Sequence, residues 1–498
     1  MAKAAKYERC VKKRLQVVRI LTVFPKSILF FVAGTAPILF GAVQPWVWSI
    51  YSVLICAAFL IRMWQHPRMP HIAAGSRAGT ACLAFFLVWT LLQIFPMPPQ
   101  ALAVFSPHRH QLVVASSALL DRQIPWSPLS YDIRHSLARW IFVLSLAFYY
   151  WLFQNTFTKS RDLKMLAWTL MGLGAMESLY GLVQSLVPAI GVLWMDASHA
   201  YVGMARGTYI NRNHFAGFLE MIGMLCLGYT AAMGYRPFKK GWRKLLSSDS
   251  INRLIFFSMV LVVMLFALLL SQSRAGIASA IAGTATFFTL TRLSSKKSPI
   301  GLYIMAGVIV SLFIAYGLVI DFKPLIERFL RLGKDVDRIK IWQDGLAIVR
   351  DHPLGIGLAN FPHVFPVYHV ASSPRVRFTH VHNDWLELLI ETGWPGFVAL
   401  AGGFVYFLFR SVRNVLKLAP GVDPLRFFLA VGAVSGLTAL AFHSLVDFNL
   451  QIPANCIYFV TLLGIVSICI RDYGRDVHRP GKKRKIMRNT RQSGWAGR

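Results

Sequence analysis

The sequence predicts an all-α membrane protein, a polytopic bundle of about twelve transmembrane helices with a large loop domain between spans nine and ten. Of its 498 residues, 55% are hydrophobic and only 15% are charged, too few to cover a soluble protein of this size. Apolar runs such as 254–271 and 301–320 are long enough to cross a bilayer core of roughly 30 Å. Basic residues recur in alternate loops, as they do in multi-pass membrane proteins.

Each span is predicted from an apolar run of about 17 to 20 residues or more, bounded by charged or turn-forming residues. The first two runs follow each other closely, so the boundary between them is not sharply defined. We see no internal repeat. In chain order, the expected spans are 27–43, 45–61, 79–96, 138–154, 165–187, 214–234, 254–271, 275–291, 300–320, 394–410, 427–446 and 453–470.

The distribution of basic residues predicts the orientation of the bundle. Lysine and arginine fill the N-terminal arm, the loops 236–244, 292–297 and 410–417, and the tail after residue 470. With an even number of spans these segments share one side, which the positive-inside rule identifies as the cytoplasm. The expected parts are a basic cytoplasmic arm (1–26), spans one to nine (27–320), an external loop (321–393), spans ten to twelve (394–470) and a basic cytoplasmic tail (471–498).

The net charge and the cysteines exclude some classes of protein. A formal charge of +32 fits contact with anionic lipid better than nucleic-acid binding, because the basic residues mark one set of loops. We expect no cleavable signal peptide. The six cysteines lie in the basic arm or in and beside the apolar spans, and none forms a CxxC pair. We therefore expect neither disulfide bonds nor a metal site.

The richest polar stretch is HVHNDWLELLIETGWPG, residues 380–396, at the end of the longest external loop. Asn383 or Asp384 is expected to cap a helix there, and Asp384 with Glu387 resembles a capping box. Gly393 would end that helix before the next span begins. Capping does not explain His380 and His382. A histidine exchanges a proton near neutral pH, although an interfacial histidine bonded to a backbone carbonyl would look the same in sequence.

Arginines mark two further candidate segments on the same predicted face. Arg274 in SQSRAG (271–276) follows a long apolar run in a turn too tight for an ordinary loop, beside Ser273. An arginine at a bilayer boundary is costly, so it is either functional or reaches toward water. The second segment, residues 205–221, carries Arg206, Asn211, Arg212 and Asn213 before span six. The alternative for that segment is a polar helix entry capped by asparagine.

Two weaker candidates complete the predicted site. Arg338 precedes the turn-rich segment HPLGIGLANF (352–361) and is either a phosphate ligand or a solvated charge. His443 and Asp447, before the last span, are expected to form a structural pair.

The shared pattern is arginine with histidine at one membrane face. Arginine presents a planar fork of donors that fits phosphate oxygens and keeps its charge. A neutral histidine nearby can remove a proton from a hydroxyl. Together they suit the displacement of a lipid diphosphate by an alcohol, in which arginines stabilise the departing diphosphate and histidine activates the acceptor.

At these residues the chain resembles the O-antigen ligase and O-antigen polymerase superfamily of bacterial envelope enzymes, over about residues 200–450. The resemblance rests on three motifs in the family's order along the chain. They are Gly207, Thr208, Tyr209, Asn211, Asn213 and Phe215; then Ser273, Arg274, Ala275 and Gly276; then His382, Asn383 and Gly393.

The resemblance implies a metal-independent, inverting glycosyltransferase of the bacterial inner membrane, without a cofactor and with a periplasmic active site. It implies a glycan on undecaprenyl diphosphate as donor, a sugar hydroxyl of lipid A–core or of another glycan as acceptor, and no nucleic acid. His382 would be the base or orient the acceptor, and His380 is its rival. Arg274, Arg212, Arg206 and Arg338 would bind the diphosphate, supported by Ser273, Asn211, Asn213, Asn383 and Glu387.

Several functions remain open at this point. A polymerase of the same family, joining units of O-antigen or exopolysaccharide, and a protein O-oligosaccharyltransferase share much of this pattern. A polysaccharide transporter or flippase is the non-enzyme alternative. That class places ionisable groups at mid-span and shows two similar halves, whereas the polar groups here gather at one face.

Overall fold

The computed structural model describes residues 23–65, 77–157, 159–187, 189–195, 201–239, 250–294, 336–369 and 378–477. In these residues the regular structure is helical, apart from two isolated bridges that join Met97 to Ser127 and Val192 to Met195. The all-α prediction is confirmed for this part of the chain. The predicted span 300–320 lies outside the described residues.

Eight of the described helices are long and apolar enough to cross a membrane, so the protein is a membrane-embedded helical bundle. Two shorter apolar helices are Val23–Thr35 and α3 (Arg77–Leu92), and α11 (Arg274–Ser294) packs among the long ones. The count of twelve spans stays a prediction. The eight are α2 (Pro45–Gln65), α6 (Ile133–Thr156), α7 (Ser160–Leu186), α8 (Arg212–Lys239), α10 (Ser250–Leu270), α16 (Asp384–Val415), α17 (Pro424–His443) and α18 (Pro453–Val477).

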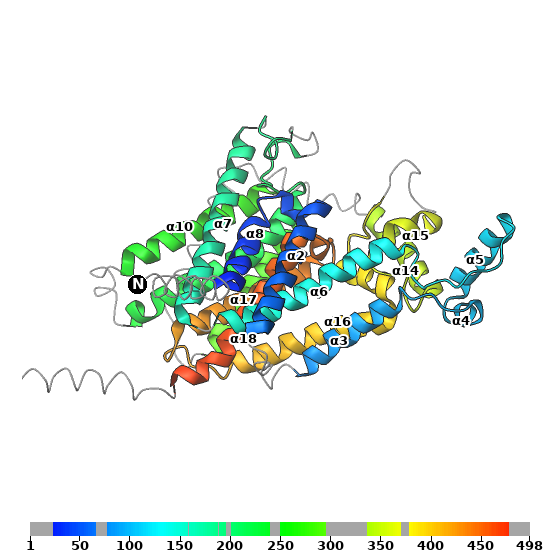
Figure 1. The fold of residues 1–498 in the computed structure, drawn as a ribbon. Helices are drawn as coiled ribbons and strands as arrows, with labels where there is room; N and C mark the ends of the chain where they lie inside the picture. Colours follow the sequence, from blue (N-terminus) through cyan, green and yellow to red (C-terminus); the bar gives the residue numbers. More distant parts are fainter. Residues whose placement is uncertain are drawn as a thin grey trace, which may run out of the picture.

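The bundle is built around α8 and α17, which pack against each other in its centre (Figure 1). Their backbones approach closely because glycines face the contact. A Cβ at Gly228 would lie 2.3 Å from the carbonyl oxygen of Phe428, and one at Gly432 would lie 2.5 Å from that of Met224. Small residues at helix contacts are the usual basis of tight packing in membranes. Helices α7, α10 and α11 pack on α8, and α18 packs on α17.

Four short helices form a lobe at one end of the bundle: α4 (Pro99–Phe105), α5 (Pro107–Leu119), α14 (Val336–Asp351) and α15 (Phe361–Tyr368). Figure 1 shows α14 and α15 beside the first turns of α16, with α4 and α5 beyond them. This end lobe has its own apolar core, which includes Ile348, Phe361 and Ile390. It is formed by segments that the sequence predicted as external loops.

The end lobe is fastened to the bundle at a break in α16. Gly393, with φ 66° and ψ −178°, interrupts the helix, as the sequence predicted. The break exposes backbone groups that must find partners inside the protein. The loop before α15 supplies them: the amides of Ile356 and Gly357 donate to the carbonyls of Ile390 (3.2 Å) and Glu391 (2.9 Å). Two glycines, Gly355 and Gly393, allow the two backbones to meet.

Replacing Gly393 by alanine should destabilise the protein. Its backbone conformation is open essentially only to glycine, and a Cβ there would lie 2.3 Å from the carbonyl carbon of Leu354. We expect a loss of about 2 kcal/mol or more, measured as a lower midpoint of thermal unfolding in detergent. Gly402→Ala, in the same helix with open space around the position, is the matched control and should keep the wild-type midpoint. Equal midpoints for the two variants would contradict this reading of the break.

Candidate functional site

The candidate site lies where α8, α11 and α16 begin and α17 ends, beside the end lobe. Its centre is Asp447, in the turn between α17 and the short 3-10 helix η4 (Asn449–Gln451). Asp447 is fully buried. One oxygen, Oδ2, accepts a hydrogen bond from the Nδ2 of Asn213 at 2.6 Å, and Oδ1 accepts one from the backbone amide of Phe448 at 2.9 Å.

Two histidines lie close to this buried carboxylate. The Nδ1 of His382 lies 3.6 Å from Asp447 Oδ1, and the Nε2 of His214 lies 3.9 Å from it. Burial by itself raises the pKa of Asp447. The close approach of His382, with the charges of His214 and His443, outweighs burial and holds that pKa well below its usual range. Asp447 is therefore an anion throughout the physiological pH range.

The ring of Phe448 contacts three of the imidazoles, one stacked on it and two at steep angles to it. Its ring centroid lies 4.2 Å from that of His380, which stacks on it, 4.6 Å from that of His214 and 4.8 Å from that of His382. His380 also has its own carboxylate, because its Nδ1 lies 2.7 Å from Glu387 Oε1. Glu387 thus orients the ring of His380 through a hydrogen bond, whereas His382 lies near Asp447 at a longer, ion-pair distance.

His382 has a left-handed backbone conformation, with φ 56°. This conformation is uncommon for a residue other than glycine, and such strain gathers at functional sites. The next residue, Asn383, caps α16 by accepting a hydrogen bond from the amide of Leu386 at 3.0 Å. The predicted capping box of Asp384 and Glu387 is wrong. Glu387 turns instead toward His380 and accepts a hydrogen bond from the amide of Val381 at 3.0 Å.

Asp384 fastens the start of α16 to the turn that carries Asp447. Its Oδ2 accepts hydrogen bonds from the hydroxyl of Ser444 at 2.7 Å and from the amide of Leu450 at 2.9 Å. Its own amide donates to the carbonyls of Ser444 and Asp447. The orientation of His382 toward Asp447 therefore depends on these backbone contacts as well as on the side chains.

The arginine motifs lie side by side next to this cluster. Arg212, the first residue of α8, donates from Nη1 to the carbonyl of Ser271 at 3.3 Å. Arg274 is the first residue of α11, and the hydroxyl of Ser273 accepts a hydrogen bond from the amide of Gly276 at 3.2 Å. A Cβ on Gly276 would lie 2.5 Å from the Cβ of Ala216, so α11 and α8 begin in close contact. Arg212 thus contacts the segment that bears Arg274. Asn213, the residue after Arg212, donates a hydrogen bond to Asp447.

The two other predicted arginines have separate partners. Arg338, in α14, donates from Nη1 to the carbonyl of Val446 at 3.1 Å, next to Asp447. Arg206 is buried, and its guanidinium lies 5.6 Å from the ring centroid of Tyr201. The residue before it, Ala205, donates its amide to the carbonyl of Leu270 at 3.0 Å, next to the segment that bears Arg274.

Several residues of the first motif have structural roles. Both the amide and the hydroxyl of Thr208 donate to the buried carboxylate of Glu177 at 2.8 Å. The hydroxyl of Tyr209 donates to Asn455 at 3.1 Å. Asn211 caps α8, since its side chain accepts from the amide of Asn213 at 2.9 Å, as the alternative interpretation expected. The motif therefore anchors the turn before α8 to α7 and α18, and so positions Arg212 and Asn213.

The sequence interpretation underestimated the turn after α17. His443 and Asp447 were expected to be a structural pair, but Asp447 binds the first motif and approaches His382 of the third. His443 lies 3.3 Å from both oxygens of Glu220, in the centre of α8. No local pattern indicates this, because the partners of Asp447 are far away in the chain. The one available signal was an aspartate and a histidine within an apolar region.

The described part of the chain is thus a bundle of membrane-type helices with arginines and histidine–carboxylate contacts gathered at one end. Residues 259–401 match the family model described as O-antigen ligase. The chain thus carries the domain of the O-antigen ligase superfamily, a glycosyltransferase-like family, and the predicted resemblance is confirmed. The matched segment includes the motifs of Arg274 and His382, whereas Arg212 and Asp447 lie outside it. No curated protein matches the chain.

A second buried polar cluster lies inside the end lobe, around His352. Its Nδ1 lies 3.3 Å from the hydroxyl of Ser106, and its Nε2 lies 3.3 Å and 3.2 Å from those of Tyr131 and Tyr368. Burial lowers the pKa of His352 to about 4, helped by the nearby positive groups. The charged and titratable neighbours are His108, Arg109, Tyr131, Asp351 and Tyr368. The neutral imidazole joins α4 and α5 to α14 and α15.

This cluster predicts that the end lobe loses stability in acid. Between pH 6.5 and about pH 4 the unfolded chain binds a proton at His352 that the folded chain excludes, so stability falls as the pH falls through this window. The full effect is up to about 3 kcal/mol. His352→Gln should reduce the drop in the thermal unfolding midpoint between about pH 7.5 and about pH 5, and His110→Gln should not. An unchanged pH dependence in His352→Gln would contradict this assignment.

Proposed function

We propose that this protein transfers a glycan from undecaprenyl diphosphate to a sugar hydroxyl of lipid A–core, at the periplasmic face of the bacterial inner membrane. Two findings support the proposal: the O-antigen ligase domain, and the meeting of the His382, Arg274 and Arg212 motifs around Asp447. The meeting of the motifs is the stronger support for the proposal, because a base and phosphate-binding groups must lie close together for this reaction.

His382 would act as the base. An ionised carboxylate only accepts hydrogen bonds, so Asp447 favours the tautomer of His382 with its proton on Nδ1. Nε2 is then left with a lone pair for the hydroxyl proton of the acceptor. As the proton moves to Nε2, the acceptor oxygen forms its bond to the anomeric carbon. The bond between that carbon and the diphosphate oxygen breaks with inversion, and the electron pair leaves with the diphosphate.

Arg212 and Arg274 would bind the diphosphate and stabilise the charge that develops on it. Guanidinium groups pair with phosphate oxygens through two parallel hydrogen bonds and remain charged at all relevant pH values. Two arginines beside each other supply positive charge of the kind that a metal ion supplies in other transferases, so the mechanism needs no metal. Arg338 and Arg206 would contribute from the edges of the site.

The positive-inside rule supports a periplasmic site. The ends of the bundle away from Asp447 carry several basic side chains, which are Lys159 and Arg161 at the start of α7, Arg292 at the end of α11, and Arg410 and Arg413 at the end of α16. Short basic segments of this kind remain in the cytoplasm. The candidate site would therefore face the periplasm, where a lipid-linked donor meets its acceptor.

We expect His382→Asn to slow glycan transfer by about 10² to 10⁴-fold, because asparagine tolerates the left-handed backbone but cannot act as a base. Transfer would be measured in proteoliposomes with undecaprenyl-diphosphate-linked glycan and rough lipopolysaccharide. His380→Asn is the matched variant for the rival base and should retain more activity than His382→Asn. A wild-type rate in His382→Asn would show that the assigned base is wrong even if the family is right.

The same assay tests the arginines. Arg274→Ala should slow transfer by about 10²-fold or more, since it removes charge from the leaving diphosphate. Arg292→Ala, at the other end of the same helix, is the control and should act like wild type. Product analysis separates the alternatives. A ladder on lipid A–core establishes a ligase, whereas a longer donor with bare lipopolysaccharide establishes a polymerase.

A further inference from the structure

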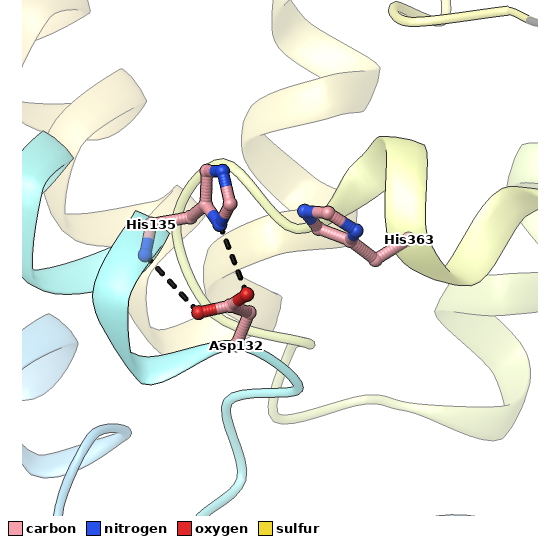
Figure 2. A group of neighbouring side chains, drawn as sticks. All are labelled: Asp132, His135 and His363. Atoms are coloured by element: carbon pink, nitrogen blue, oxygen red, sulfur yellow. Dashed lines mark hydrogen bonds and ion pairs between the residues drawn. The ribbon is translucent and has the colours of Figure 1, made fainter.

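Another cluster of chemically active side chains lies outside this site, where α6 begins beside α15. It contains Asp132, His135 and His363, and Figure 2 shows the three side chains facing one another. Atoms able to bind a metal, one from each residue, lie within 4.8 Å of one another. Both imidazoles are exposed and Asp132 is half-buried, so an ion could enter from solvent. The transfer chemistry uses none of these groups.

The position of the first two groups follows from the N-terminus of α6. Asp132 is its N-cap, and Oδ1 accepts hydrogen bonds from the amides of Arg134 at 2.8 Å and His135 at 3.3 Å. This leaves Oδ2, which lies 3.0 Å from Nδ1 of His135. His363 faces this pair with its ring centroid 4.8 Å from that of His135. In the part of the chain that the structure describes, the His363 ring takes part in no hydrogen bond or ion pair.

One buried residue, Asn360, fixes the two segments that carry the cluster. Its Oδ1 accepts a hydrogen bond from the amide of Asp132 at 2.9 Å, and its Nδ2 donates to the hydroxyl of Ser136 at 2.8 Å. Its carbonyl accepts from the amide of His363 at 3.0 Å. Asn360 therefore fixes the backbone of Asp132 through its side chain and the backbone of His363 through its carbonyl. Metal sites need this kind of rigid support.

We propose that Asp132, His135 and His363 bind a divalent cation of the zinc type, which clamps α6 to α15. Two imidazoles and one carboxylate are the ligands that zinc prefers, with bonds of about 2.0 to 2.2 Å. Magnesium and calcium take oxygen ligands and are a poor match. Small rotations of the exposed side chains bring the three donors around one ion, and water completes the coordination. Such a site departs from the sequence-based expectation of no metal site, because its ligands come from two distant segments.

The clamp would be structural. It joins the first turn of α6, in the bundle, to α15, in the end lobe, and so adds to the Asn360 hydrogen bonds and to the contacts at the break in α16. Metal binding to the folded state stabilises it by mass action. The simpler alternative is that His135 only pairs with the capping carboxylate of Asp132. That alternative gives His363 no role.

The test uses the full-length protein, purified in detergent without a histidine tag and stripped with a chelator. Zinc would be added, excess removed by dialysis, and bound metal counted by elemental analysis beside the thermal unfolding midpoint. We expect one zinc per chain at this site and a midpoint raised by about 2 °C or more. Magnesium and calcium should not raise it. Absence of bound zinc in the wild type would overturn the proposal.

Variants assign any bound zinc to this cluster. His363→Ala should lose the bound zinc and the rise in midpoint. Asp132→Asn keeps an oxygen to cap α6, so it should fold and yet bind zinc more weakly. His110→Ala, in α5, is the control and should bind zinc like wild type. Retention of zinc by His363→Ala would overturn the proposal, as would its loss from His110→Ala. The zinc-binding results do not test glycan transfer. Transfer activity can be measured separately on the same preparations.

Discussion

The site depends on the burial of one negative charge. Asp447 has no access to water, and a carboxylate in such a place is stable only with hydrogen bonds and polar neighbours. The structure supplies them from three separate segments: Asn213 from the start of α8, His382 from the approach to α16, and the turn that carries Asp447 itself. These contacts bring the motifs of Asn213 and His382 together around Asp447. The same contacts that satisfy the carboxylate set the orientation of the histidine.

Rigid backbone contacts hold this arrangement in place. The break at Gly393 is filled by the loop before α15, and Asp384 ties the first turn of α16 to the turn after α17. His382 lies two residues before Asp384 and has a left-handed conformation. The strain at His382 is offset by the many bonds around it, as is common where a side chain must be held in one direction.

The sequence predicted the features that depend on local composition. The long described helices follow the expected apolar runs, Gly393 interrupts its helix, and Asn383 and Asn211 cap theirs. The sequence could not predict features that depend on distant partners. The capping box failed because Glu387 is attracted to His380 instead, and Asp447 was undervalued because its partners lie on other helices. Asp132 and His363 show the same limit, since 231 positions in the chain separate residues that face each other.

The most direct test of the Asp447–His382 unit is a double-mutant comparison of transfer rates in proteoliposomes. His382→Asn, Asp447→Asn and the double variant would be measured with saturating donor and acceptor. If Asp447 acts by orienting His382, Asp447→Asn alone slows transfer, and adding it to His382→Asn slows transfer no further. Independent, multiplying losses would contradict this coupling, as would a wild-type rate in Asp447→Asn. Asparagine at 447 keeps the shape of the carboxylate, so a shared loss would come from the missing charge.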